Sequence, residues 1–172
     1  MDSDDDFAGR IRIQMRKAFF DRLGEDIRGG DFESTFELLE ESKNRICAVV
    51  PKRTDIHAQL NESIDIAYFK QMVKHNAFET NHIKSIMEAL INHIKSLGSE
   101  HDEPFHEIFR TQIEVRFQRG EQLDRILPFF FDETMLRLDK LEHDIETFKN
   151  SEIYKMLMEQ RERNEFLRKS SS

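Results

Sequence analysis

The chain has few of the residues that form disulfides or tight turns. It contains a single cysteine, Cys47, with three prolines, six glycines and no tryptophan. A lone cysteine excludes a disulfide within the chain, which indicates a reducing compartment, so we expect a cytoplasmic protein. The scarcity of glycine and proline argues against a β-sandwich or a β-barrel, because either would need many tight turns.

Long apolar runs and clustered positive charges are also missing. No stretch approaches the roughly 20 apolar residues of a membrane-spanning helix, so we expect no membrane span. The acidic start, residues 1–6, lacks the apolar core of a signal peptide. The net charge of −8 argues against nucleic acid as a partner, since phosphate binding needs clustered Lys and Arg, but it suits a basic protein partner.

Amphipathic helices account for most of what the chain does contain. Its length suits one domain, and 35% of its residues are charged against 38% that are hydrophobic. Helical spacing of apolar residues predicts helices over 8–28, 32–50, 55–75, 78–97 and 104–119, followed by a long helical segment after residue 120 and a short last helix from Ile153. The long segment is expected to begin or kink at Pro128 and to break near Asn150. The sequence therefore predicts an all-α, single-domain bundle of about six to seven amphipathic helices with a long C-terminal helix.

The expected domain has a polar tail at each end. Residues 1–6 are predicted to form a disordered acidic tail, 7–158 the helical domain, and 159–172 a polar C-terminal tail that frays. Apolar residues in the long C-terminal helix alternate at spacings of three and four, as in a coiled-coil seam. They are Leu127, Phe130, Thr134, Leu138, Leu141, Ile145 and Phe148. The seam packs within the domain in the simplest interpretation; a dimer or an assembly through the C-terminal helix is the alternative.

Two Glu-x-x-His motifs, at residues 79–82 and 103–106, are the sharpest catalytic or metal-binding candidates. Di-iron helical bundles use two such motifs around one metal pair, whose ions lie only a few Å apart. Here each motif begins one of two consecutive helices, and antiparallel packing would separate the motifs by on the order of 20 Å. Cys47 lies beside an apolar stripe and is interpreted as an inert thiol. We therefore predict no catalytic residue, no cofactor, no metal ligand and no enzymatic activity.

The residues most suited to binding are acidic or aromatic. The face of the second helix opposite its apolar stripe carries the candidates Glu33, Glu37, Glu40 and Glu41. Three consecutive phenylalanines, at 129–131, cover most of a helix circumference, so one amphipathic face cannot bury them all. Phe130 and Phe131 continue the seam, which leaves Phe129 as the candidate for contact with a partner.

The order of these elements resembles the first conserved block of the T-complex protein 11 family. The resemblance lies in Ala18–Leu23 (AFFDRL), Asp31–Phe32 leading into Phe36–Leu39, Val50–Arg53 (VPKR), Leu60–Asp65 (LNESID), and Gln71–Phe78. Residues 83–97 resemble its continuation, and the likeness extends through residue 150. The resemblance implies a non-enzymatic, all-helical protein with no family catalytic residues. It also implies a link to regulation of cyclic-AMP and protein kinase A signalling, and in animals to sperm function.

Three hypotheses about function remain open on the sequence. The first is a helical interaction module, a regulator of kinase signalling by resemblance, whose acidic face and Phe129 bind a protein partner. The second is a structural subunit of a larger assembly, such as a cytoskeletal, axonemal or particle-associated complex, motivated by the long C-terminal seam. The third is a helical metal protein that uses the Glu-x-x-His motifs.

Overall fold

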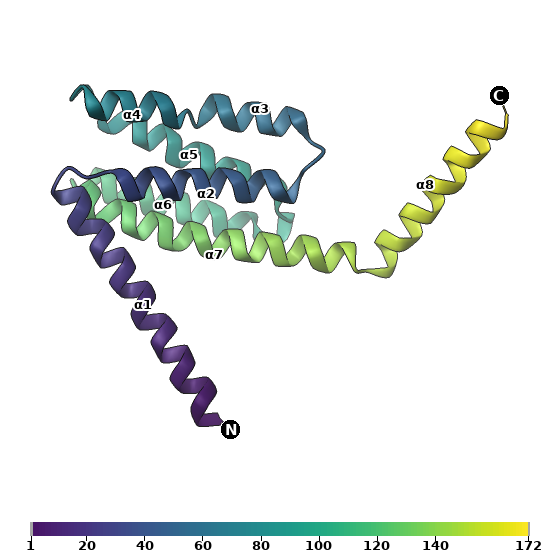
Figure 1. Ribbon diagram of the computed structural model, residues 1–172, viewed down its shortest axis with the longest axis horizontal. Helices are drawn as coiled ribbons and strands as arrows, with labels where there is room; N and C mark the ends of the chain where they lie inside the picture. The colour runs from purple at the N-terminus through teal and green to yellow at the C-terminus, as the bar shows by residue number, and fades with distance from the viewer. Residues whose placement is uncertain (1, 172) are drawn as a thin grey trace.

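The computed structural model describes residues 2–171, and that part of the chain is almost entirely helical, with no strand (Figure 1). Its elements are α1 (Asp2–Arg28), α2 (Glu33–Val49), α3 (Thr54–Ser63), α4 (Ile66–Lys74), α5 (Thr80–Leu97), the 3₁₀ helix η1 (Glu100–Asp102), α6 (Glu103–Gln118), α7 (Leu123–Lys149) and α8 (Glu152–Ser170). The predicted all-α single domain with a long C-terminal helix is confirmed. Only Asn150 and Ser151 separate α7 from α8, so taking these two as one element gives seven α-helices over the described residues.

The core is built around α7, which lies against α1, α2, α5 and α6 (Figure 1). Each of the helices α2 to α7 contributes an apolar stripe to one continuous cluster. The largest of the fully buried side chains are Phe69, Phe109, Phe130, Phe131, Leu23, Leu39, Ile46, Leu60, Ile64, Ile83, Met87 and Leu90. Their contacts span the chain from α1 to α7, which is why the bundle forms one domain.

Pro128 lies inside α7, which begins five residues earlier, at Leu123, rather than at the proline. A proline has no backbone N–H, so the carbonyl oxygen of Asp124 loses its intrahelical hydrogen bond. Gly24 of α1 approaches at this point: a Cβ atom placed on it would lie 2.7 Å from that oxygen and 3.6 Å from the Pro128 ring. The glycine therefore allows α1 and α7 to approach closely where α7 is irregular.

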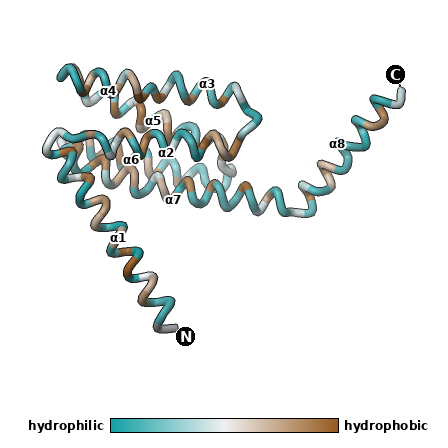
Figure 2. Tube along the Cα trace, in the orientation of Figure 1, coloured by the Kyte–Doolittle hydropathy of each residue, from teal (hydrophilic) through white to brown (hydrophobic). Residues whose placement is uncertain are grey.

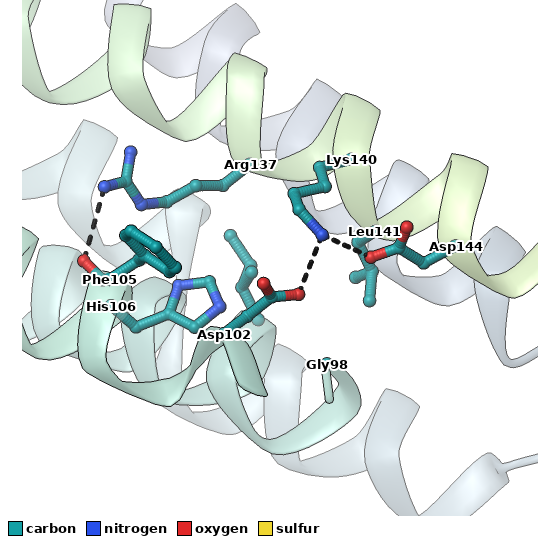
Figure 3. Close-up of a pocket in the computed structure, with 9 residues that line it drawn as sticks. Gly98, Asp102, Phe105, His106, Arg137, Lys140, Leu141 and Asp144 are labelled. Carbon is teal, nitrogen blue, oxygen red and sulfur yellow. Dashed lines mark hydrogen bonds and ion pairs between the residues drawn. The ribbon is translucent and has the colours of Figure 1, made fainter. Parts of the chain in front are cut away.

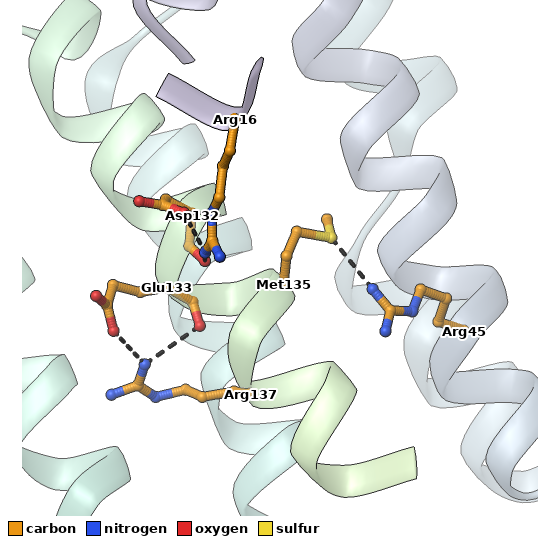
Figure 4. Close-up of polar contacts among 6 residues, drawn as sticks. All are labelled: Arg16, Arg45, Asp132, Glu133, Met135 and Arg137. Carbon is orange, nitrogen blue, oxygen red and sulfur yellow. Dashed lines mark hydrogen bonds and ion pairs between the residues drawn. The ribbon is translucent and has the colours of Figure 1, made fainter. Parts of the chain in front are cut away.

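Ion pairs lie on both sides of this close approach, where α1 crosses α7 obliquely (Figure 1). Arg28 pairs with Asp124 at 2.9 Å. Two to three turns away, Arg16 donates to the Asp132 carbonyl oxygen at 3.0 Å and pairs with its carboxylate (Figure 4). Only the C-terminal half of α1 packs in this way, and the N-terminal half projects from the bundle (Figure 1).

The single helix predicted over 55–75 is wrong: it is divided into α3 and α4. The chain turns at Ile64 and Asp65, where the Asp65 carboxylate accepts a hydrogen bond from the backbone N–H of Tyr68 at 3.0 Å. Asp is a strong N-cap residue, so it starts a new helix instead of continuing the old one. Lys43 of α2 donates to the Ile64 carbonyl oxygen at 2.8 Å, which gives this C-terminal carbonyl of α3 a hydrogen-bond partner.

Both polar ends of the described chain are helical. Helix α1 starts at Asp2, so it includes residues 2–6, where the sequence predicts a disordered tail; Met1 lies outside the described residues. Acidic residues favour the positive end of the helix dipole, and Asp6 pairs with Arg10 at 2.5 Å. At the other end α8 continues to Ser170 without burying any residue, and hydrophilic residues dominate it (Figure 2). Across residues 2–171 no helix combines the length and apolar character that crossing a membrane requires.

Replacing Gly24 by alanine should destabilise the fold. The new Cβ would meet backbone oxygen at 2.7 Å, so α1 and α7 must move apart. We expect the free energy of unfolding in urea to fall by about 1–3 kcal/mol. Gly9→Ala is the matched control, because it lies in the same helix and a Cβ added there would have nothing within 4 Å. It should be neutral or slightly stabilising. Equal stability of the two variants would contradict the close-approach argument.

Candidate interaction surfaces

An open acidic groove lies between α2 and α7. It has a volume of about 520 Å³, and three glutamates of α2 line it: Glu37, Glu40 and Glu41. Glu142 of α7 lies on the opposite side, and Asn44, Arg45 and Ala48 complete the lining. We call this surface the acidic groove. The structure thus brings together three of the four predicted acidic residues, whereas Glu33, at the first position of α2, lies outside the lining.

Arg45 holds the two helices of the acidic groove together. Its guanidinium donates to both carboxylate oxygens of Glu142, at 2.7 and 2.9 Å, and to Asp139 at 2.5 Å. A further contact reaches the Met135 sulfur at 3.4 Å (Figure 4). The hydrogen bonds to Glu142 raise the pKa of Arg45 above its ordinary value, so this cation is always charged.

Arg45 is paired with Asp139 and Glu142 of α7, so its positive charge does not neutralise the three glutamates of α2. Glu37, Glu40 and Glu41 are exposed, and none of them forms an ion pair with another described residue. The acidic groove therefore carries uncompensated negative charge toward solvent. Asp139 and Glu142 were not identified from the sequence, although they follow Leu138 and Leu141 directly in the α7 seam, which is the pattern of residues at the margin of a buried face.

Phe129 lies in a second groove, on the α6 side of α7. Phe130 and Phe131 are fully buried, as their place in the seam predicts, while Phe129 is half-buried. The Arg116 guanidinium covers its ring at 3.8 Å, a cation–π geometry, and Phe109 lies 6.1 Å away. This groove has a volume of about 500 Å³ and is otherwise lined by Glu107, Ile108, Thr111, Gln112, Val115 and Arg119. It shares no residue with the acidic groove, so the predicted acidic and aromatic residues line separate surfaces.

A smaller, partly open cavity of about 220 Å³ lies between the C-terminal end of α5, the N-terminal end of α6 and the C-terminal half of α7. Lys140 bridges two carboxylates at its edge, Asp102 at 2.9 Å and Asp144 at 2.7 Å (Figure 3). The hydrogen bond from Lys140 holds the pKa of Asp102 below its ordinary value. Apolar atoms dominate the lining, which includes Ile94, Phe105 and Leu141. The cavity is thus a mainly apolar space with an ion-pair network at its edge.

His106 is the one buried imidazole of this cavity. Its Nδ1 atom is buried and has no hydrogen-bond partner among the described residues. Burial lowers the pKa of His106, and the nearby Arg137 guanidinium lowers it further, so the ring is neutral at physiological pH. An ordered water in the cavity could supply the missing partner.

The two Glu-x-x-His motifs lie at opposite ends of the α5–α6 pair. Near the second motif, Lys95 pairs with Glu107 at 2.6 Å, and at the other end Lys84 lies 5.6 Å from the Phe117 ring. The two helices are therefore antiparallel, as predicted, and the motifs are far apart. Over residues 2–171, no three His, Cys, Asp or Glu side chains gather as metal ligands would. Cys47 is a half-buried free thiol beside the core.

These features define an all-helical, single-domain protein whose distinctive surfaces are grooves between helices. Residues 1–99, which run from α1 through α5, match the family model of T-complex protein 11. The match covers more than half of the 172 residues, and the chain belongs to this family. The resemblance is thereby confirmed, while its extension through residue 150 stays a prediction. No curated protein and no solved structure matches the chain.

The neutral His106 should make stability depend on pH. Its folded-state pKa is lowered, so the unfolded chain binds the proton first as the pH falls through about 6.5. The free energy of unfolding should therefore fall between about pH 7 and pH 5. His106→Gln should reduce this slope, and His93→Gln should reduce it further, because burial lowers the pKa of His93 too. The exposed His143→Gln serves as the control, and an unchanged slope in His106→Gln would contradict the argument.

Proposed function

We propose that this protein is a non-catalytic, cytoplasmic interaction module whose acidic groove binds a basic segment of a partner protein. The observation that carries the proposal is the group of three exposed glutamates, Glu37, Glu40 and Glu41, none of which forms an internal ion pair with the described residues. Their uncompensated charge lies in an open groove between α2 and α7 rather than on an isolated helix. The overall charge of −8 strengthens attraction to a basic partner at long range.

The spacing of the glutamates indicates the shape of the partner. Glu40 and Glu41 lie three and four residues after Glu37, so all three project along one side of α2. A helical segment with Lys or Arg at the same spacing could pair with all three while it lies along the groove. Such pairs, at the rim of an interface, mainly raise the association rate and set specificity. Glu33, one turn before Glu37, could extend the contact.

Phe129 is proposed as a separate anchor. Its half-buried ring, under the Arg116 guanidinium, offers an aromatic surface with a cation beside it. Aromatic and Arg side chains are enriched among the residues that carry most of the energy of protein interfaces. A partner that contacts both Phe129 and the acidic groove would have to span α7.

Family membership supports a narrower version of the proposal. By resemblance, members of the T-complex protein 11 family are linked to cyclic-AMP and protein kinase A signalling. We infer that a component of this signalling system is the first partner to test. A subunit of the kinase that presents a basic helix would fit the acidic groove.

The alternative function, a structural subunit of a larger assembly, rests on α8. This helix buries none of its residues and projects from the bundle (Figure 1). It nevertheless exposes the large apolar residues Ile153, Met156, Leu157, Phe166 and Leu167. Exposed apolar groups on a projecting helix favour contact with other chains.

Charge reversal tests the acidic groove. Glu37→Lys with Glu41→Lys should weaken binding of purified protein kinase A subunits, or of partners captured from native lysate, by at least about tenfold. The reason is that two favourable charge pairs become repulsive. Isothermal titration and quantitative mass spectrometry of captured proteins would measure the loss.

The matched control is Glu88→Lys with Glu114→Lys. These glutamates are exposed on α5 and α6, far from α2 in the sequence and outside the acidic groove, and the net charge changes equally. If both double variants lose the same partners, only net charge matters. If neither loses any, the acidic groove is not the binding surface.

Removing α8 separates the two functions. A chain ending at residue 151 should unfold at nearly the same urea concentration as the full chain, because no residue of α8 is buried and its ring contact with the bundle is that of Tyr154 with Phe148. An interaction module that uses the acidic groove should retain its partner after this truncation. A subunit that assembles through α8 should lose it.

A further inference from the structure

Helix α1 carries two apolar stripes, and the bundle uses only one of them. Arg16, Phe20, Leu23 and Ile27 form the stripe toward α7, at spacings of four, three and four. A second series follows the same rule on the other side of the helix. It comprises Asp4, Ala8, Ile11, Met15, Ala18 and Arg22, at spacings of four, three, four, three and four. This is the repeat of a helix that pairs with another helix.

The second stripe is open to solvent. Ile11 is 39% exposed and Met15 67%, and two phenylalanines beside the stripe, Phe7 and Phe19, are 64% and 48% exposed. The N-terminal half of α1 projects away from the bundle, so no other described helix covers these residues (Figure 1). So many large apolar groups on one face of a projecting helix mark a contact surface.

The second stripe is complementary to itself when read in the opposite direction. Two copies of α1 that run antiparallel and cross at the level of Ile13 place Ile11 against Met15 of the other copy. The same register places Ala8 against Ala18, while Phe7 and Phe19 flank the stripe on opposite sides. Every apolar position thus meets an apolar position, as a two-fold symmetric interface requires. The small Ala8–Ala18 pairs on either side of the two Ile11–Met15 pairs let the two helix axes approach.

Charge completes the match and distinguishes a second copy from a lipid surface. Residues 7–20 contain four basic residues and no acidic one, which by itself would suit an anionic membrane. However, Asp4, Asp5 and Asp6 lie at the start of the same helix and would be repelled there. In the antiparallel pair, Asp4 of each copy meets Arg22 of the other. Neither Asp4 nor Arg22 has an ion-pair partner among the described residues.

We propose that the protein forms a homodimer in which α1 pairs antiparallel with α1 of a second copy through Asp4, Ala8, Ile11, Met15, Ala18 and Arg22. The pairing leaves the α7-facing stripe and the acidic groove untouched, so it can hold or fail independently of the proposed function. The interface is small, with only a few large apolar side chains from each copy, so a Kd on the order of micromolar is expected.

Sedimentation of the full-length chain tests the dimer. The wild type should be dimeric at about 100 µM, well above the expected Kd. Met15→Asp should weaken the dimer at least about 100-fold, because each dimer buries the new charge twice. Ile13→Asp is the matched control, since Ile13 is 70% exposed on the same helix but lies off the second stripe. Circular dichroism should show both variants folded.

A charge exchange tests the pairing of the helix ends. Asp4→Arg or Arg22→Asp alone should weaken the dimer about tenfold through repulsion at two symmetric sites. The double variant should restore wild-type affinity. Failure of the double variant to recover would overturn the register.

Disulfide trapping tests the antiparallel direction in a Cys47→Ser background. A mixture of Ala8→Cys and Ala18→Cys chains should form a covalent dimer, whereas either chain alone should not. Cross-linking of each chain with itself would indicate parallel pairing and overturn the proposal. A wild-type monomer at about 100 µM would do the same. A dimer whose affinity Met15→Asp does not change would also overturn the proposal. Binding of the wild type to phosphatidylserine vesicles that Met15→Asp abolishes would overturn it in favour of a lipid surface.

Discussion

The fold depends on burying α7 from several directions. Phe130 and Phe131 point to different sides of this helix and are both fully buried, stacked or edge-on against neighbouring rings. A helix that is apolar around much of its circumference must be surrounded. Helices α1, α2, α5 and α6 pack around α7. The close approach at Gly24 lets α1 cover the turn of α7 where Pro128 removes a backbone hydrogen bond.

Placing α7 at the centre determines which faces are left for binding. On the α2 side, Arg45 is held by acidic residues of α7, and the outward-facing glutamates of α2 keep their charge for solvent. On the α6 side, Phe129 is the remainder of the phenylalanine run and lies under Arg116. Packing around α7 thus pairs Arg45 and buries Phe130 and Phe131. It leaves the α2 glutamates exposed and Phe129 half-exposed, on two separate surfaces.

The ends of the chain follow a different rule from the bundle. Half of α1 and all of α8 extend past the helices that could cover them, and both expose apolar side chains. For α1 the exposed stripe is regular and self-complementary in apolarity and charge, which points to a second copy. For α8 the apolar residues are mixed with many charges, and no equivalent complementarity singles out one partner. The bundle is therefore a self-sufficient body with projecting helices that differ in what they can bind.

Local sequence determined the helices, most of their breaks and the order of buried and exposed phenylalanines, because these follow from helical periodicity and backbone chemistry. It also located the acidic residues of α2. It did not divide α3 from α4, because the Asp65 cap competes with an apolar pattern that continues through it. Only the tertiary structure joined Arg45 to Glu142, 97 positions away, and decided which of the two apolar stripes of α1 is buried. Both stripes have the spacing of a buried face, and packing against α7 alone makes one of them core and the other surface.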